Sequence, residues 1–125
     1  MKLEYRDGLI FTTIQIVYEG RSKQINNVVL DTGATKSLIS QEIVDDIGIR
    51  VEKKDQIVMS YGIGGQAPAF IKNIDKIVLD DYICEDINLD FSRIDYKDIN
   101  GLLGLDILIS GGFIIDLEQM ELKMK

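Results

Sequence analysis

The sequence contains no histidine, one cysteine (Cys84) and one proline (Pro68) among its 125 residues. The lack of histidine removes the Ser-His and Cys-His arrangements of nucleophilic catalysis, and most zinc sites, from consideration. A single cysteine excludes a disulfide within the chain and fits a reducing compartment. Elimination therefore leaves carboxylate chemistry as the catalytic chemistry that this chain offers.

Basic residues are also scarce, since 14 lysines and arginines face 21 aspartates and glutamates, which gives a net charge of −7. Apart from Lys53-Lys54 the chain has no cluster of basic residues. This balance predicts no nucleic-acid partner and no binding to an anionic membrane. At this length, with 46% apolar residues, we expect one domain that spans residues 1–125.

Long apolar runs are missing as well. The most apolar window, 102–115, is shorter than the roughly 20 residues of a membrane-spanning helix, and it contains Asp106. The first 20 residues carry Glu4, Arg6 and Asp7 and lack the uninterrupted apolar core of a secretory signal. We therefore expect a soluble, cytoplasmic protein.

The segment 28–40, VVLDTGATKSLIS, stands out among what is present. A β-branched apolar run ends abruptly in Asp31-Thr32-Gly33, which places one carboxylate on a tight turn after a buried strand. Such a position often carries function, so Asp31 is the catalytic candidate. These three residue types are also common turn formers, and the bare triplet is expected by chance in roughly 3% of chains of this length.

Two further segments follow this one along the chain. Residues 59–66 read MSYGIGGQ, typical of a glycine-rich hairpin tip, and residues 99–110 read INGLLGLDILIS, in which Leu102-Leu103-Gly104 precedes a short apolar helix. Together with the Asp-Thr-Gly-Ala segment, this combination resembles the retropepsin-like aspartic proteases. The resemblance extends from about Leu9 to the C-terminus.

That resemblance implies an all-β fold, a single-lobe acid-protease closed β-barrel with a glycine-rich flap hairpin and one or two short helices. It implies that Asp31, Thr32 and Gly33 are catalytic, with Thr32 hydrogen-bonding across a dimer axis and Gly33 permitting the turn. The residues implied to bind substrate are Ala34, Tyr61, Gly62, Ile63, Gly64 and Gly65, and those implied to support the site are Leu102, Leu103 and Gly104. No metal and no cofactor are expected.

Hydrolysis by aspartic acids needs two carboxyl groups roughly 3 Å apart that share a proton, because like charges at that distance cannot both ionise. One chain offers one suitable residue, Asp31. The economical solution is a homodimer whose two-fold axis passes between the two copies. We therefore predict an aspartic endopeptidase that acts on extended peptide or protein substrates, with apolar subsites around the cut.

Periodicity and turn residues predict the remaining elements. Strands are expected at 9–18, 24–31, 56–60, 67–73, 76–79 and 83–91, followed by a final hairpin of 113–117 and 121–125. Helices are expected at 41–47, with Ser40 as its N-cap and Gly48 as its stop, and at 105–109. The carboxylates of 83–91, including Asp86 and Asp90, are expected on a solvated face, and Pro68 on an edge.

Two other functions are compatible with the same residues. A retropepsin-like module can bind peptides or dimerise without cutting them, because a fold can persist without its chemistry. A monomeric β-domain used for assembly is the third reading. The chain also departs from the retroviral pattern, with Thr35 where those enzymes usually carry Asp, and with Lys36 as either a charge that biases the dyad towards ionisation or an ordinary solvent-facing one.

Overall fold

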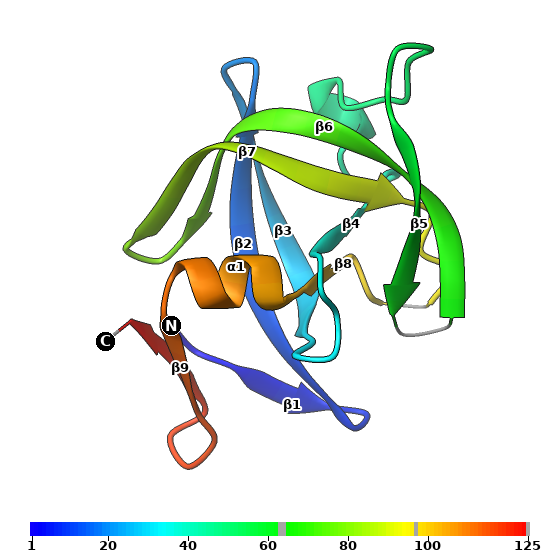
Figure 1. Ribbon diagram of the computed structural model, residues 1–125. Helices are drawn as coiled ribbons and strands as arrows, with labels where there is room; N and C mark the ends of the chain where they lie inside the picture. Colours follow the sequence, from blue (N-terminus) through cyan, green and yellow to red (C-terminus); the bar gives the residue numbers. More distant parts are fainter. Residues whose placement is uncertain (63–64, 97, 125) are drawn as a thin grey trace.

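Strands dominate the computed structural model of the protein, which describes residues 1–62, 65–96 and 98–124 (Figure 1). The strands are β1 (Glu4–Arg6), β2 (Leu9–Tyr18), β3 (Arg21–Leu30), β4 (Leu38–Ser40), β5 (Ile57–Gly62), β6 (Gly65–Leu79), β7 (Tyr82–Ser92), β8 (Gly101–Leu103), β9 (Phe113–Asp116) and β10 (Glu121–Met124). The helical segments are the 3-10 turn η1 (Asp45–Ile47) and the helix α1 (Leu105–Ser110). The predicted mostly-β class and the helix after Gly104 are confirmed.

Eight of these strands form one sheet in the order β1-β2-β3-β8-β4-β7-β6-β5. Strand β2 also pairs with β6, so six strands are joined in a ring of pairings. The short β8 lies parallel to β3, and β4 lies parallel to β7, although most neighbours are antiparallel. Closure of this sheet into a barrel stays a prediction from the resemblance.

The β2–β3 hairpin forms where the sequence predicts it. Strand β2 has the predicted bounds. Its partner β3 begins at Arg21, three residues before the predicted start, and ends at Leu30, one residue before the predicted end. Glu19 and Gly20 make the turn, both with positive φ. Because alternate residues of β2 such as Ile14 and Ile16 are buried, the hairpin places one face on the core.

Strand β6 corrects the prediction of two strands at 67–73 and 76–79. It runs without a break through Asp75 and arches over the molecule in Figure 1. Buried positions follow one alternation up to Ile74 and the opposite one from Ile77 onwards. A twisted strand that changes the face it buries produces this change of phase, which looks like a break when the sequence is read alone.

The helix predicted at 41–47 is wrong except for its last turn. Ser40 ends β4, where its amide donates to the carbonyl of Asn100 (2.9 Å), and the next amide, of Gln41, donates to Ser92 (2.8 Å). The backbone of Ser40 and Gln41 is therefore bonded to distant segments in an extended conformation, and a helix cannot begin there. Gly48 stops η1 in the predicted left-handed conformation, at φ 87°.

No helix in the described part of the chain is long and apolar enough to cross a membrane.

The end of β7 overturns the predicted solvated face. Asp86 is exposed, as expected, but Asp90 is only 5% exposed. Four consecutive residues, 89–92, are buried, because β4 packs alongside this end of β7 with Leu38 opposite Asp90. Alternation predicts exposure only while one face of a strand stays open to water.

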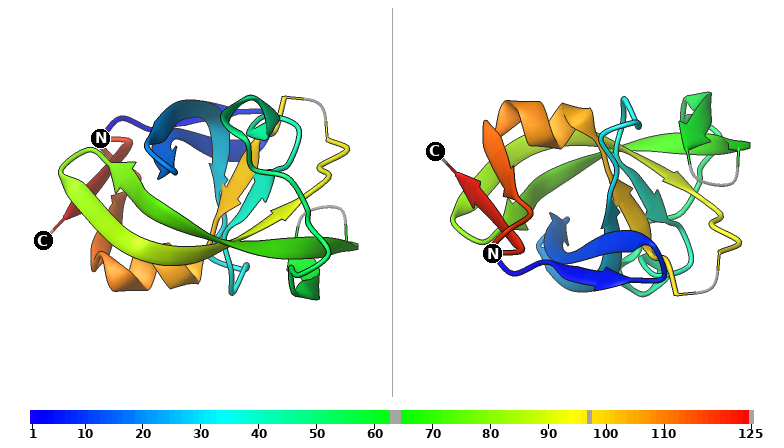
Figure 2. Two further views of the ribbon diagram at one scale, coloured as in Figure 1. Left: turned by 90° about the horizontal axis from the view of Figure 1, so that it is seen from above. Right: turned by 90° about the horizontal axis from the view of Figure 1, so that it is seen from below.

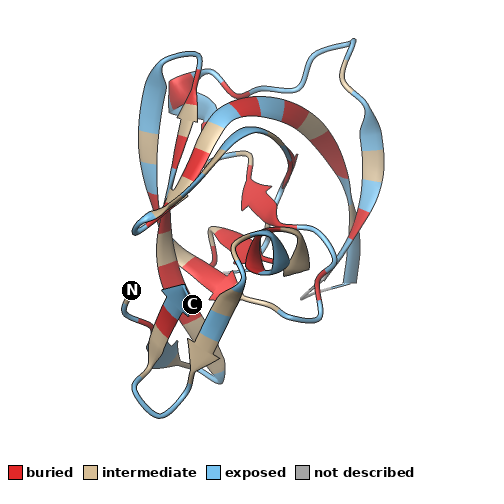
Figure 3. Ribbon diagram, turned by 60° about the vertical axis from the view of Figure 1, so that its left-hand side comes forward, coloured by how far each residue is buried: buried red, intermediate tan, exposed pale blue. Residues whose placement is uncertain are grey.

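Aliphatic side chains make up most of the core. Ile16, Ile25, Ile74 and Leu103 have no exposed surface at all, and the rings of Phe70 and Phe91 stack with centroids 5.7 Å apart. Figure 3 shows the buried positions concentrated on the strands that cross the interior. A second buried cluster lies beneath the end of β3 and includes Val29, Leu38 and Leu102.

Both ends of the chain lie together at one side of the molecule (Figure 2). The amino group of Met1 donates to the carbonyl of Leu122 (2.9 Å), and the amide of Leu122 donates back to Met1 (2.8 Å). Strand β10 pairs with β9 on its other side, as the predicted final hairpin requires, with Lys125 outside the described residues. The N-terminal segment therefore pairs with β10 of its own chain.

A buried cation fastens the loop before β5 to the middle of β6. Lys72, whose side chain is 6% exposed, contacts Glu52 at 2.5 Å and Asp55 at 2.9 Å. Burial by itself lowers the pKa of Lys72, but the two carboxylates outweigh burial and leave that pKa raised. The hydrogen bond from Lys72 likewise lowers the pKa of Asp55 and of Glu52.

Replacing this cation is expected to destabilise the fold. In Lys72→Met the largely covered Asp55 carboxylate loses its partner, so the Tm at pH 7 falls by several degrees. Because the pKa of Asp55 is lowered by folding, its contribution is present above the ordinary pKa of about 3.9 and is lost as the pH falls through its folded value.

Thermal melts between neutral and acidic pH measure this difference. The Tm values of wild type and Lys72→Met should converge as the pH falls. Lys76→Met, the same change at a partly exposed position of the same strand, serves as the control and should differ little from wild type. A constant gap between wild type and Lys72→Met at every pH contradicts the assigned role of Asp55.

Candidate active site

Asp31 follows the last residue of β3 and is held from three sides. Its amide donates to the carbonyl of Leu103 (2.9 Å), and its own carbonyl accepts from the amide of Ala34 (3.1 Å). Its Oδ1 accepts from the amide of Gly33 (3.0 Å). The two backbone bonds fix the main chain of Asp31, and the bond from Gly33 orients its carboxyl group, which is half-buried and so partly open to solvent.

Strand β8 supports the Asp31 loop from below. It pairs in parallel with β3, with Leu102 opposite Val29 and Leu103 opposite Leu30. At Gly104 the two segments come so close that a Cβ atom would lie 2.7 Å from the carbonyl oxygen of Ala34. Only glycine fits there without moving the loop.

The start of α1 completes this support. The amide of Leu105 donates to the carbonyl of Ala34 (2.8 Å), and the amide of Asp106 donates to that of Thr35 (3.2 Å). The first amides of a helix have no partner within the helix. Here the loop supplies their acceptors, so the sequence Leu102-Leu103-Gly104 and the Asp31 loop form one hydrogen-bonded unit.

Ser37 and Asp106 are site residues that the sequence analysis missed. The carboxylate of Asp106 accepts from the Ser37 amide (2.9 and 3.0 Å) and from its hydroxyl (2.7 Å). The hydroxyl oxygen in turn accepts from the buried amide of Gly104 (2.9 Å). Both residues stand inside the two motifs, but nothing in a single sequence indicates that they face each other.

The predicted residues around Asp31 differ in exposure. Thr32 and Gly33 are exposed and border the carboxyl group. Ala34 is 1% exposed, so its methyl group is almost completely covered by the protein and offers little surface for the substrate contact predicted from the sequence. Within the described ranges no group of three Cys, Asp or Glu side chains is arranged to hold a metal ion.

The predicted hairpin is present between residues 57 and 79. Strands β5 and β6 pair from Ile57 opposite Phe70 to Gly62 opposite Gly65, and Gly65 has a φ of 98°. Tyr61 is 67% exposed near the tip. Ile63 and Gly64, both predicted to bind substrate, lie outside the described residues.

A pocket of about 230 Å³ joins this hairpin to the Asp31 loop. The loop contributes Gly33, Thr35 and Lys36, the hairpin contributes residues 59–61, and Asp90 lies between them. The structure thus brings Gly33 and Tyr61, two residues predicted from separate motifs, to one cavity.

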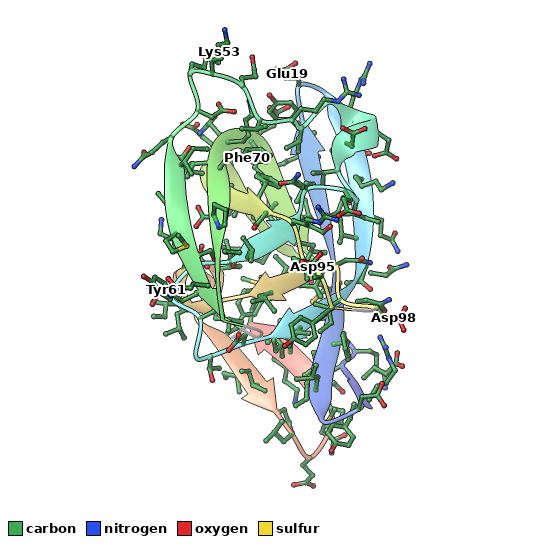
Figure 4. The ribbon with its side chains drawn as sticks, turned by 90° about the vertical axis from the view of Figure 1, so that its right-hand side faces the viewer. Glu19, Lys53, Tyr61, Phe70, Asp95 and Asp98 are labelled. Carbon is green, nitrogen blue, oxygen red and sulfur yellow. The ribbon has the colours of Figure 1, made fainter. Side chains whose placement is uncertain are left out.

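A second pocket, of about 150 Å³, opens on the other side of the hairpin. Its apolar lining comes from Leu38, Ile94, Ile99 and Leu102, and its rim includes Asp95. In Figure 4, Tyr61 and Asp95 lie on either side of the β5–β6 ribbon. The hairpin therefore separates two pockets with different linings.

Each pocket contains one basic and one acidic side chain, Lys36 and Asp90 in the first and Arg93 and Asp95 in the second, but only Asp90 is buried. Burial raises the pKa of the Asp90 carboxyl, Lys36 opposes that rise, and Asp106 adds to it. The outcome is a raised pKa for Asp90. Sequence reasoning missed this residue because it treated the whole of 83–91 as having one open face.

The comparisons with known proteins agree with this geometry. A family model for aspartyl proteases matches residues 14–107, which is most of the chain. A crystal structure of a retropepsin-like aspartic protease from Rickettsia conorii superposes with a TM-score of 0.65, at 20% identity over 92% of this chain and 82% of that one. The comparison with curated proteins gave no match.

Taken with the fold and the Asp31 loop, these findings mean that the chain belongs to the aspartyl protease family and has a retropepsin-like fold.

Removing the Ser37 hydroxyl should loosen this site. Ser37→Ala leaves the buried Gly104 amide without its acceptor and takes one donor from Asp106, so the free energy of unfolding should fall by about 2 kcal/mol. Urea unfolding measures this change. Ser22→Ala, at an exposed position of β3, is the matched control, and equal stability of the two variants would contradict the role of this network.

Proposed function

We propose that the protein is an aspartic endopeptidase in which two Asp31 carboxyl groups, one from each subunit of a homodimer, activate a water molecule. The observation that carries the proposal is the Asp31 carboxyl group itself. It is half-exposed, oriented by the Gly33 amide at 3.0 Å, and held on a loop that β8 and α1 fix from below. A rigid, accessible carboxylate is what this chemistry requires.

The dimer follows from the number of carboxyl groups. The sequence contains a single Asp-Thr-Gly, and two carboxyls must approach to about 3 Å to share one proton. A two-fold axis next to Asp31 brings the second copy to that place. Thr32, exposed beside Asp31, is then positioned to hydrogen-bond across the axis and keep the two loops aligned.

In the proposed reaction one carboxylate takes a proton from the bound water, whose oxygen attacks the carbonyl carbon of the scissile peptide. The other carboxyl group, which is protonated, hydrogen-bonds the carbonyl oxygen as negative charge develops on it. The resulting tetrahedral intermediate collapses when the amide nitrogen is protonated and the C–N bond breaks. The products are a carboxylic acid and an amine, and the dyad returns to its shared proton.

Substrate would lie extended between the loop and the β5–β6 hairpin, which we propose acts as a flap. Gly62 and Gly65, which pair at the end of the two strands, would let the backbone approach the substrate and bend to admit it. The pocket lined by Leu38, Ile99 and Leu102 supports an apolar subsite next to the cut. Closure over the substrate would exclude water from the reacting groups.

Replacing the carboxyl group by an amide tests the chemistry. Asp31→Asn keeps the shape of the loop but removes the proton acceptor, so cleavage of a diverse peptide library should fall by about three orders of magnitude or more. Mass spectrometry of the products, with concentrated protein from acidic to neutral pH, is the measurement.

Asp81→Asn changes the charge equally at an exposed turn residue and should cleave like wild type. Equal cleavage by Asp31→Asn and wild type would refute the assigned role of Asp31. A wild-type protein that is dimeric and cleaves nothing at any pH would instead indicate a peptide-binding module without activity.

Mixing the two proteins tests whether the site is shared between subunits. Wild type is equilibrated with a ninefold excess of Asp31→Asn, so that most wild-type chains enter mixed dimers with one carboxyl pair incomplete. Activity per wild-type chain should then fall about tenfold. An equal mass of serum albumin in place of the variant controls for crowding, and unchanged activity in the mixture would show that one chain carries the whole site.

A further inference from the structure

Asp90 is a buried acid with no evident structural duty. The residue is only 5% exposed, and among the described residues neither a hydrogen bond nor an ion pair fixes its carboxyl group. It lines the 230 Å³ pocket together with Gly33, Lys36 and Tyr61. Because this carboxyl group opens to the pocket without a partner, a cation that entered the pocket would stabilise its charged form.

The position of the pocket suggests what that partner is. One wall belongs to the loop that carries Asp31 and the other to the hairpin strand β5. On the proposed function, a peptide lying between these walls directs side chains close to the cut into this pocket. Within the described part of the chain, no cation lies within ion-pair distance of the Asp90 carboxyl group in this pocket.

We propose that Asp90 is the charged end of a subsite that binds a lysine or arginine side chain of the substrate. This inference rests on the proposed function and adds to it a substrate class. Met59 and Tyr61, which are 49% and 67% exposed, would cover the methylene groups of such a side chain. Its cationic head would then reach Asp90 and form the ion pair that the folded chain lacks.

Lys36 weakens the proposed preference for a basic side chain but does not abolish it. Its positive charge acts on Asp90 from the rim of the pocket, but its side chain is exposed on a flexible stem and forms no ion pair there. It therefore competes weakly with a substrate cation. Removing it should strengthen the preference for a basic side chain.

The two-fold symmetry of the proposed homodimer predicts a second feature of the cleavage preference. A homodimer would contain two such pockets, related by the axis between the Asp31 groups. The preference for a basic side chain should therefore appear twice, at equal distances before and after the cut. Apolar pockets that accept any large side chain would not produce this pattern.

The test uses matched peptides that carry either lysine or the uncharged norleucine, placed in turn at each position from three before to three after the cut. The readout is the ratio of kcat/KM for the lysine peptide to that for the norleucine peptide. At the preferred position this ratio should fall at least about tenfold in Asp90→Asn, because a charge-assisted contact is lost. It should rise in Lys36→Gln.

Asp86→Asn is the matched control, since it removes the same charge from an exposed position on the same strand and should keep the wild-type ratio. A ratio unchanged in a folded Asp90→Asn protein overturns the subsite, while cleavage by wild type upholds the protease. If wild type cleaves nothing, the protease proposal fails, and fluorescence polarisation of labelled versions of the same peptides decides the subsite. Weaker binding of lysine peptides to Asp90→Asn supports it, and equal binding refutes it.

Discussion

The position of Asp31 depends on one hydrogen-bonded contact between two distant segments. Ser37 and Asp106 join the loop after β3 to the start of α1, and the Ser37 hydroxyl also accepts a hydrogen bond from the amide of Gly104. This contact works only because Gly104 has no side chain, since a Cβ there would meet the Ala34 carbonyl at 2.7 Å. The loop that this junction fixes carries the Asp31 carboxyl group and one wall of the pocket beside it.

Two pockets lie next to the β5–β6 hairpin. One has Leu38, Ile99 and Leu102 in its lining, and the other contains the buried Asp90. The Lys72 ion cluster anchors the base of the hairpin to the loop before it, far from the tip. A fixed base agrees with the flap role proposed for the hairpin, because bending would then be confined to the residues beyond it.

The site was more predictable from the sequence than its surroundings. The Asp-Thr-Gly and Leu-Leu-Gly segments are local signals, because glycine and a short polar residue at the end of an apolar run strongly favour a tight turn over continued strand or helix. At Asp75 the prediction failed because the twist of β6 changes the face that the strand buries. The failures at Ser40 and at Asp90 have another cause: a neighbouring strand, distant in sequence, decided the backbone or the burial, whereas periodicity reports only the residues next to each other.

The separation between Ser37 and Asp106 also has a consequence in time. These residues are 69 positions apart, and the parallel pairing of β3 with β8 spans a similar length of chain. Such contacts form late, because a long stretch of chain must first be ordered to bring them together. During synthesis the Asp31 loop leaves the ribosome early, but the amides of Leu105 and Asp106 that bind it follow much later, so the loop cannot take up its folded arrangement before α1 has emerged.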